Sequence, residues 1–295
     1  MIKKRQPWII GLFLLAFLLQ ITAAAALQAA EVNVYAFKAG VLQTQTQYIL
    51  KDTRIGTPLN VPVPFFLIKH GQDWVAFDTG MNVKVVDDAV GHWGEGIVKA
   101  YTPVMTREEE FKAQIKKAFG LTPKDLKAVI VSHGHLDHAG SIGNFKGTNV
   151  PLYFQKIEMD EVRKIVDAKK AGTAYPLGDY EFLSELNIKE IDGVYDVFGD
   201  KTVVAFPVPG HTPGQQALYI KPSKGKPFII TSDAMYTLEN MEKNIPPGLA
   251  WDIPLTQLNV SYFRLFALVA NTIIVPMHDD GYWENKDVAP KEFKP

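Results

Sequence analysis

The sequence predicts an α/β fold with many strands, on the strength of three observations. Short apolar runs rich in β-branched residues, such as residues 128–131, have the length and composition of buried strands. A longer stretch beginning at Thr106 carries apolar residues three and four positions apart, which is typical of an amphipathic helix. The 295 residues are 47% hydrophobic and 21% charged, and no linker or low-complexity tract divides them. We therefore expect a single domain over residues 31–295.

The strand signals are short apolar segments bounded by glycine, proline or polar residues. In chain order they are residues 32–37, 63–69, 74–77, 127–132, 152–155, 189–191, 202–208, 216–220, 228–232 and 272–277. A turn at residues 70–72 joins the second and third segments, which makes them a hairpin candidate.

The helix signals lie between these strands. A capping box of Thr106 and Glu109 predicts the start of a helix, and Gly120 predicts its end. The other segments expected to be helical are residues 138–145, 158–169 and 257–269.

The first thirty residues have the pattern of a secretory signal peptide. Basic residues at positions 3–5 precede an apolar run over residues 8–21, and we expect cleavage between Ala25 and Ala30. The run is short for a permanent membrane span, so an uncleaved N-terminal anchor is the alternative. We expect an exported protein, in the periplasm or secreted, that contacts a membrane only through this signal.

The composition excludes several classes of protein. The chain has no cysteine, which excludes a lipoprotein anchored through that residue and a metal site with a thiolate ligand. The formal net charge is −1, and no basic stripe interleaved with aromatic residues is present. Nucleic-acid binding is therefore not expected.

Four candidate metal ligands fall within six residues, directly after a strand-like run. His133 and His135 are two positions apart, so on an extended backbone both rings can reach one ion. Asp137 and His138 follow and can turn toward a second ion. Imidazole and carboxylate together suit zinc-like ions, so we predict a metal site. The alternative is a polar loop with solvated histidines.

Three further candidates follow other strand signals. His211 stands in a Pro-Gly-His-Thr-Pro-Gly turn, whereas Asp233 and His278 each come directly after an apolar run. Five histidines and two aspartates could therefore meet at one rim, enough for three ligands per ion and a shared carboxylate. The other two histidines, His70 and His92, lie apart from any such context.

The order of these motifs resembles the metallo-β-lactamase superfamily, over essentially the whole chain after residue 31. Tyr236 stands three residues after Asp233, and this Asp-x-x-Tyr resembles the N-acyl homoserine lactonases, which are quorum-quenching lactonases. The segments Asp-Thr-Gly-Met from Asp78 and Met-Thr-Arg-Glu-Glu from Met105 are also similar to that family.

The resemblance implies a four-layer αβ/βα sandwich that holds two divalent ions. His133, His135 and His211 would bind one ion, Asp137, His138 and His278 the other, and Asp233 would bridge them. Zinc is the expected metal, with cobalt, manganese and iron as alternatives. A hydroxide held between the ions would open the lactone ring of an N-acyl homoserine lactone, a small-molecule substrate.

The resemblance also implies roles for residues around the metals. The Tyr236 phenol would donate to the carbonyl oxygen in the transition state, although a tyrosine of the core is the alternative. Asp137 would also pass a proton to the leaving alkoxide. Asp78 would orient a metal-bound histidine, or else cap a turn. Apart from the resemblance, three aromatic residues are candidates for lining an acyl-chain pocket, with covering of the core as the favoured alternative for each: Trp93, Tyr101 and Trp251.

Two departures from the family pattern concern the substrate. Leu136 stands where well-known lactonases carry an aromatic residue, and residues 90–104 match no known pocket closely. The alternatives are another hydrolase of the same fold (an organophosphate or ester hydrolase, or a β-lactamase) and a non-catalytic metal-binding protein. The sequence leaves the acyl-chain preference and the oligomeric state open, with a homodimer among the options.

Overall fold

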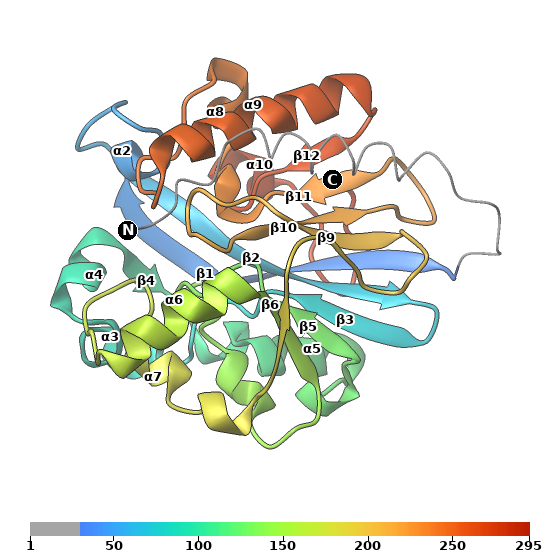
Figure 1. The fold of residues 1–295 in the computed structure, drawn as a ribbon, viewed down its shortest axis with the longest axis horizontal. Helices are drawn as coiled ribbons and strands as arrows, with labels where there is room; N and C mark the ends of the chain where they lie inside the picture. The colour runs from blue at the N-terminus through green and yellow to red at the C-terminus, as the bar shows by residue number, and fades with distance from the viewer. Residues whose placement is uncertain (1–29) are drawn as a thin grey trace.

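The computed structural model describes residues 30–295, and their strands form two sheets (Figure 1). The expected signal segment therefore lies outside the described residues, apart from Ala30. The larger sheet has the order β4-β1-β2-β3-β5-β6-β7 and the smaller β12-β11-β10-β9-β8. The strands are β1 (Val32–Gln45), β2 (Pro58–His70), β3 (Asp73–Phe77), β4 (Thr102–Val104), β5 (Ala128–Ile130), β6 (Pro151–Gln155), β7 (Asn187–Ile191), β8 (Tyr195–Asp196), β9 (Val203–Pro207), β10 (Gln216–Ile220), β11 (Phe228–Ile230) and β12 (Ile273–Val275).

Helices cover the outer face of each sheet (Figure 1). They are α2 (Thr46–Ile49), α3 (Val85–Trp93), α4 (Glu95–Ala100), α5 (Phe111–Phe119), α6 (Lys156–Asp167), α7 (Leu177–Tyr180), α8 (Leu238–Lys243), α9 (Ile253–Val269) and α10 (Asp280–Glu284). Five single turns of 3₁₀ helix complete the described chain: η1 (Arg107–Glu109), η2 (Pro123–Asp125), η3 (Ile142–Phe145), η4 (Leu183–Glu185) and η5 (Ser232–Ala234). The order helix, sheet, sheet, helix is the predicted four-layer sandwich.

Alternation along the strands explains why the two sheets stack. In β2, Phe65 and Leu67 pack toward the helices of the larger sheet, whereas Phe66 and Ile68 pack toward the smaller sheet. Successive side chains of a strand point to opposite faces, so a strand that is apolar throughout is buried on both. A third apolar cluster lies between the smaller sheet and α9.

Strand direction brings distant parts of the chain to one edge. In the larger sheet β3, β5, β6 and β7 run parallel, and in the smaller sheet β11 and β12 do. Residues that follow parallel strands lie at the same edge of a sheet, which is where open α/β sheets bind ligands. The predicted hairpin of β2 and β3 is confirmed by their antiparallel pairing from Phe66 with Phe77 to His70 with Asp73.

Two of the helices predicted from the sequence differ from those in the structure. Thr106 and Glu109 do form a capping box, but it caps η1, and α5 begins at Phe111 after Glu110 in an extended conformation. The helix predicted over residues 138–145 is wrong except for the turn η3. Its first carbonyl, that of His138, accepts instead from the N–H and hydroxyl of Thr79, at 2.8 and 3.0 Å.

The last long helix begins earlier than its apolar pattern indicates. The Asp252 carboxylate accepts from the N–H of Leu255 at 2.9 Å and so caps α9, which starts four residues before the predicted position. Among the helices of residues 30–295, none combines the length and apolar character needed to cross a membrane.

We expect Phe66→Ala to lower the free energy of unfolding by about 3–5 kcal/mol, because it empties the core between the two sheets. Phe66 is fully buried, with its ring centroid 5.8 Å from that of Trp283 and 5.5 Å from that of Phe293. Chemical denaturation followed by circular dichroism measures the change. The control is Leu268→Ala on the outer face of α9, where the side chain is 76% exposed; an equal loss in both variants would contradict the prediction.

Candidate metal centre

The seven predicted ligand residues come together at the shared edge of the two sheets. His133 follows β5, His211 follows β9, Asp233 lies in η5 after β11, and His278 follows β12. The side chains form two groups, in each of which the potential ligand atoms lie within 4.8 Å of one another. One group is His133, His135, His211 and Asp233; the other is Asp137, His138 and His278.

The carboxylate of Asp233 joins the two groups, because its two oxygens face different sets of imidazoles. Oδ1 lies 2.9 Å from Nε2 of His278 and 3.0 Å from Nε2 of His138. Oδ2 lies 3.3 Å from Nε2 of His211 and 3.8 Å from Nε2 of His133. A carboxylate in this orientation can bridge two ions held side by side.

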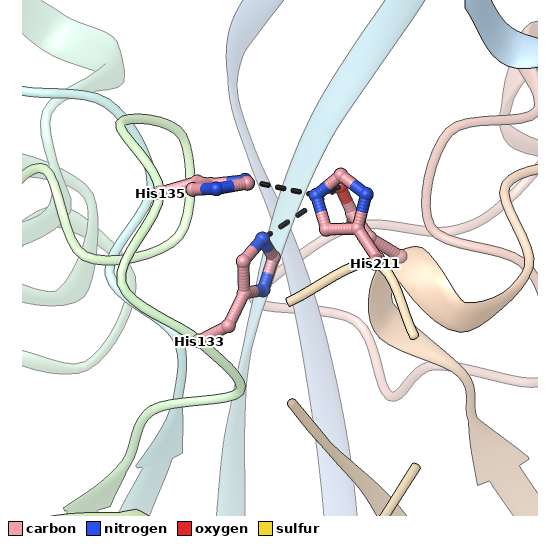
Figure 2. Close-up of side chains that lie close together, drawn as sticks. His133, His135 and His211 are labelled. Carbon is pink, nitrogen blue, oxygen red and sulfur yellow. Dashed lines mark hydrogen bonds and ion pairs between the residues drawn. The ribbon is translucent and has the colours of Figure 1, made fainter. Parts of the chain in front are cut away.

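The first group fits a divalent ion. Figure 2 shows the rings of His133, His135 and His211 converging, with Nε2 of His211 2.8 Å from Nδ1 of His135. Nε2 of His133 is buried and has no hydrogen-bond partner within residues 30–295. Buried polar atoms without a partner are rare in proteins, and a coordinated ion would satisfy this one.

The second group has the same character. Nε2 of His278 and Nε2 of His138 lie 3.3 Å apart. Oδ2 of Asp137 lies 3.5 Å from the His138 nitrogen and 3.6 Å from that of His278. Imidazole nitrogens and carboxylate oxygens from separate segments therefore surround one point, as a cation requires.

The electrostatics of the centre follow from burial and charge. Burial, reinforced by neighbouring imidazoles, holds the pKa of His133 and of His135 well below the ordinary value, so both rings stay neutral. Burial opposes ionisation of Asp233 too, but His138 and His278 outweigh it and hold the Asp233 pKa well below its usual range. Neutral His133 and His135 and ionised Asp233 are the forms that bind metal. Burial lowers the pKa of His138 and of His278, but the Asp233 charge outweighs it and holds both above the ordinary value, so an ion in the second group would displace their protons.

Hydrogen bonds from outside fix the orientation of three rings. Nδ1 of His138 lies 2.8 Å from Oδ2 of Asp78, Nδ1 of His278 lies 2.8 Å from the Pro62 carbonyl, and Nδ1 of His211 lies 3.0 Å from the Leu249 carbonyl. A ring that donates from Nδ1 keeps a lone pair on Nε2 for an ion. Asp78 therefore orients a ligand, which was one of its two predicted roles.

Tyr236 lies beside the centre, as predicted. It is buried, and its hydroxyl is 3.1 Å from Nδ1 of His211. Burial, together with the negative charge of Asp233, raises the pKa of the Tyr236 phenol well above its ordinary value. The phenol is therefore a proton donor at neutral pH rather than a phenolate.

A cavity of about 210 Å³ opens onto the centre. His135, Asp137, His211, Asp233, Tyr236 and His278 form its polar part. Its apolar wall is formed by Leu42, Ile49, Val61, Ile97, Ala100, Tyr101, Leu136, Ala174 and Leu249.

Of the three aromatic residues considered for this pocket, Tyr101 alone lines it. Trp93 is buried among the core side chains, and Trp251 is largely exposed. Except for Leu136, the other wall residues could not be predicted from the sequence, because apolar side chains of a pocket have the same spacing as those of a core.

Comparison with known proteins identifies the family. Residues 60–278 match the metallo-beta-lactamase superfamily. The chain belongs to the metallo-β-lactamase superfamily. Within it, the N-acyl homoserine lactonase AttM of Rhizobium radiobacter is 34% identical over 270 residues, which cover 89% of this chain and 99% of that protein. The N-acyl homoserine lactonase AiiA of Bacillus thuringiensis subsp. kurstaki is 34% identical over 191 residues, 65% of this chain and 71% of that protein.

Comparison of this chain with a solved structure also finds a similarity to lactonases. It is an N-acyl homoserine lactone hydrolase with the product N-hexanoyl-L-homoserine bound at its catalytic metal centre. It superimposes with a TM-score of 0.77 at 27% identity, covering 90% of this chain and all of that one. The predicted resemblance is confirmed, and the chain is a metal-dependent hydrolase with a His/Asp site for divalent metal.

We expect Asp78→Asn to weaken binding of one ion by about 10–100-fold. Asn tolerates the positive φ of 62° at this position and can still accept from the Ser132 N–H, which Asp78 binds at 2.6 Å. Its NH₂ group then faces Nδ1 of His138, which moves the ring proton to Nε2 and removes the lone pair that would bind metal. Competition with a chromophoric chelator measures the affinity.

The control for this substitution is Asp73→Asn, at the start of β3, the strand that Asp78 directly follows; the Asp73 side chain is part-exposed and pairs with Lys127. It makes the same chemical change far from the ring of His138, so both ions should bind as in the parent protein. Unchanged affinity for both ions in Asp78→Asn would show that the aspartate does not select the tautomer.

Proposed function

We propose that the protein opens the lactone ring of N-acyl homoserine lactones by hydrolysis. The observation that carries the proposal is the combination of one bridging carboxylate, Asp233, with a protonated phenol, Tyr236, under an apolar pocket. The lactonase relatives support it, since AttM and AiiA bear the name of this activity and one solved hydrolase holds its acyl-homoserine product at a metal centre.

Two ions have separate sets of ligands in this proposal. The first ion would be held by His133, His135 and His211, the second by Asp137, His138 and His278, and Asp233 would be shared. Mixed nitrogen and oxygen ligands suit zinc, and cobalt, manganese and iron are the alternatives. Bound together, two such ions supply hydroxide at neutral pH and polarise an ester carbonyl.

The protein's own side chains guide the lactone through the reaction. The Tyr236 hydroxyl donates to the carbonyl oxygen as negative charge develops there, and so stabilises the transition state. When the ring C–O bond breaks, the departing alkoxide needs a proton. Asp137, whose Oδ2 faces both His138 and His278, takes the proton that remains on the attacking oxygen and passes it to the alkoxide, which leaves a carboxylate and an alcohol.

The cavity is suited to the acyl chain. Leu42, Ile49 and Val61 from the β1–β2 region line it together with Ile97 and Ala100 of α4. An aliphatic chain that enters this space removes apolar surface from water, whereas the polar lactone stays next to the histidines. A pocket of this composition favours a neutral acylated substrate.

The direct test is to incubate the metal-loaded protein with a medium-chain acyl-homoserine lactone and follow proton release. A penicillin, a carbapenem and paraoxon serve as comparison substrates. We expect lactone opening well above the other three activities. Stronger turnover of another substrate would replace the lactone in the proposal with that ester, phosphoester or β-lactam, and no turnover with two bound ions would favour a non-catalytic metal-binding protein.

We expect Tyr236→Phe to lower kcat/KM for the lactone by about 100- to 1,000-fold, because a transition-state hydrogen bond is lost. The effect should fall mainly on kcat, and the metal content should stay at two ions. Tyr282→Phe is the control, because the Tyr282 hydroxyl is also buried but has no hydrogen-bond partner among the described residues. An unchanged rate in Tyr236→Phe would assign the tyrosine to the core.

We also propose that residues 1–30 direct export, so that the mature hydrolase meets lactone signals outside the cytoplasm and quenches them there. The basic start and the apolar run over residues 8–21 support this. Fractionation of cells that express the full chain should recover the protein in the periplasm or medium, shortened near Ala25 to Ala30. Full-length protein in the cytosol would exclude export.

A further inference from the structure

A buried carboxylate outside the seven ligands binds both loops of the first ligand group. Glu158, in the first turn of α6, is fully buried. Its Oε1 accepts from the Gly134 N–H at 2.8 Å and the Tyr175 hydroxyl at 3.0 Å. Its Oε2 accepts from the Thr212 hydroxyl at 2.7 Å and the Gly214 N–H at 3.0 Å. Burying a carboxylate is costly unless donors surround it, and this one has four.

The donors border three imidazoles of one ligand group. Gly134 lies between His133 and His135, and Thr212 directly follows His211. The Tyr175 ring also packs edge-on against His135, with 4.6 Å between the ring centroids. The residue before it, Ala174, lines the cavity. One side chain on α6 thus connects the two loops that carry these imidazoles and a wall of the pocket.

Close backbone packing leaves these loops little freedom. A Cβ atom on Gly134 would lie 2.7–2.9 Å from atoms of Tyr180, Tyr175 and Val162, and one on Gly214 would lie 2.3 Å from the backbone nitrogen of Glu158. The Tyr180 hydroxyl also donates to the Gly134 carbonyl. Gly134, between the two histidines, is therefore held at both its N–H and its C=O.

We propose that Glu158 is a positioning residue that sets the separation of the loops carrying His133, His135 and His211, and so determines the affinity for the ion they hold. Asp78 acts on one ring of the other group, whereas Glu158 acts on two loops at once. This inference rests on the proposed metal centre and not on the identity of the substrate.

Glu158→Gln tests the proposal with a nearly isosteric side chain. Each carboxylate oxygen accepts from one backbone N–H and one hydroxyl. A hydroxyl can rotate and accept from the new NH₂ group, but a backbone N–H cannot. Whichever way the amide turns, either Gly134 or Gly214 loses its acceptor and faces a donor, so one of the two loops must move.

We expect Glu158→Gln to weaken binding of the first ion by about 10–100-fold while the second ion binds as before. Metal analysis and chelator competition give the two affinities, and anomalous scattering from crystals shows which position has lost occupancy. The matched control is Glu161→Gln, the same change one turn along α6 on a carboxylate paired with Lys164. That variant should keep both ions. In Asp78→Asn the loss should appear at the other position.

Two further variants keep the proposal testable if Glu158→Gln does not fold. Thr212→Val and Tyr175→Phe each remove one hydroxyl donor, so each should weaken the same ion by a smaller factor. The proposal would be overturned if every variant that folds binds both ions with the affinity of the parent protein and shows only a lower melting temperature. Glu158 would then be assigned to the core. A fall in first-ion affinity supports it whether or not the protein opens lactones.

Discussion

The central constraint on this structure is that one carboxylate must face two groups of imidazoles at once. The two oxygens of Asp233 point to opposite groups, at 2.9 and 3.3 Å from Nε2 of His278 and of His211. Asp233, His211 and His278 follow strands of the smaller sheet. His138, whose Nε2 lies 3.0 Å from Asp233 Oδ1, follows β5 of the larger sheet, so the sheets must stack with those strand ends at the same edge. The apolar core between the sheets fixes that arrangement, since Phe66 and its buried neighbours fill the space between them. The fold and the metal site therefore depend on each other.

The polar atoms that this arrangement buries are paired by groups far away in the sequence. Asp78 binds the outer nitrogen of His138, and main-chain carbonyls of Pro62 and Leu249 bind those of His278 and His211. Each contact selects the tautomer that leaves the inner nitrogen free for an ion. Among the inward-facing ligand atoms of the described residues, Nε2 of His133 has no hydrogen-bond partner, and a bound ion would supply one.

The sequence predicts the ligands well and the pocket poorly, for a physical reason. A ligand set has a local signature, because His133 to His138 must leave one strand and turn within a few residues. Strands that are buried on both faces can also be recognised in the sequence, because they are continuous apolar runs. The helix predicted after His138 fails because Thr79, a distant residue, takes the carbonyl that a helix would need. Pocket walls such as Leu42 and Leu249 come from opposite ends of the chain and carry no pattern that separates them from core residues.

Part of the apolar wall comes from a stretch of chain that carries no reactive group. Ile97 and Ala100 belong to α4, an excursion that contributes none of the seven ligands, whereas the ligands follow strands of the inner layers. Replacement of α4 side chains can change which molecules enter while the hydrolytic apparatus stays intact. In evolutionary terms, the substrate range and the chemistry of this scaffold can diverge independently, which makes the excursion around α4 the natural region to diversify in a library for new ester substrates.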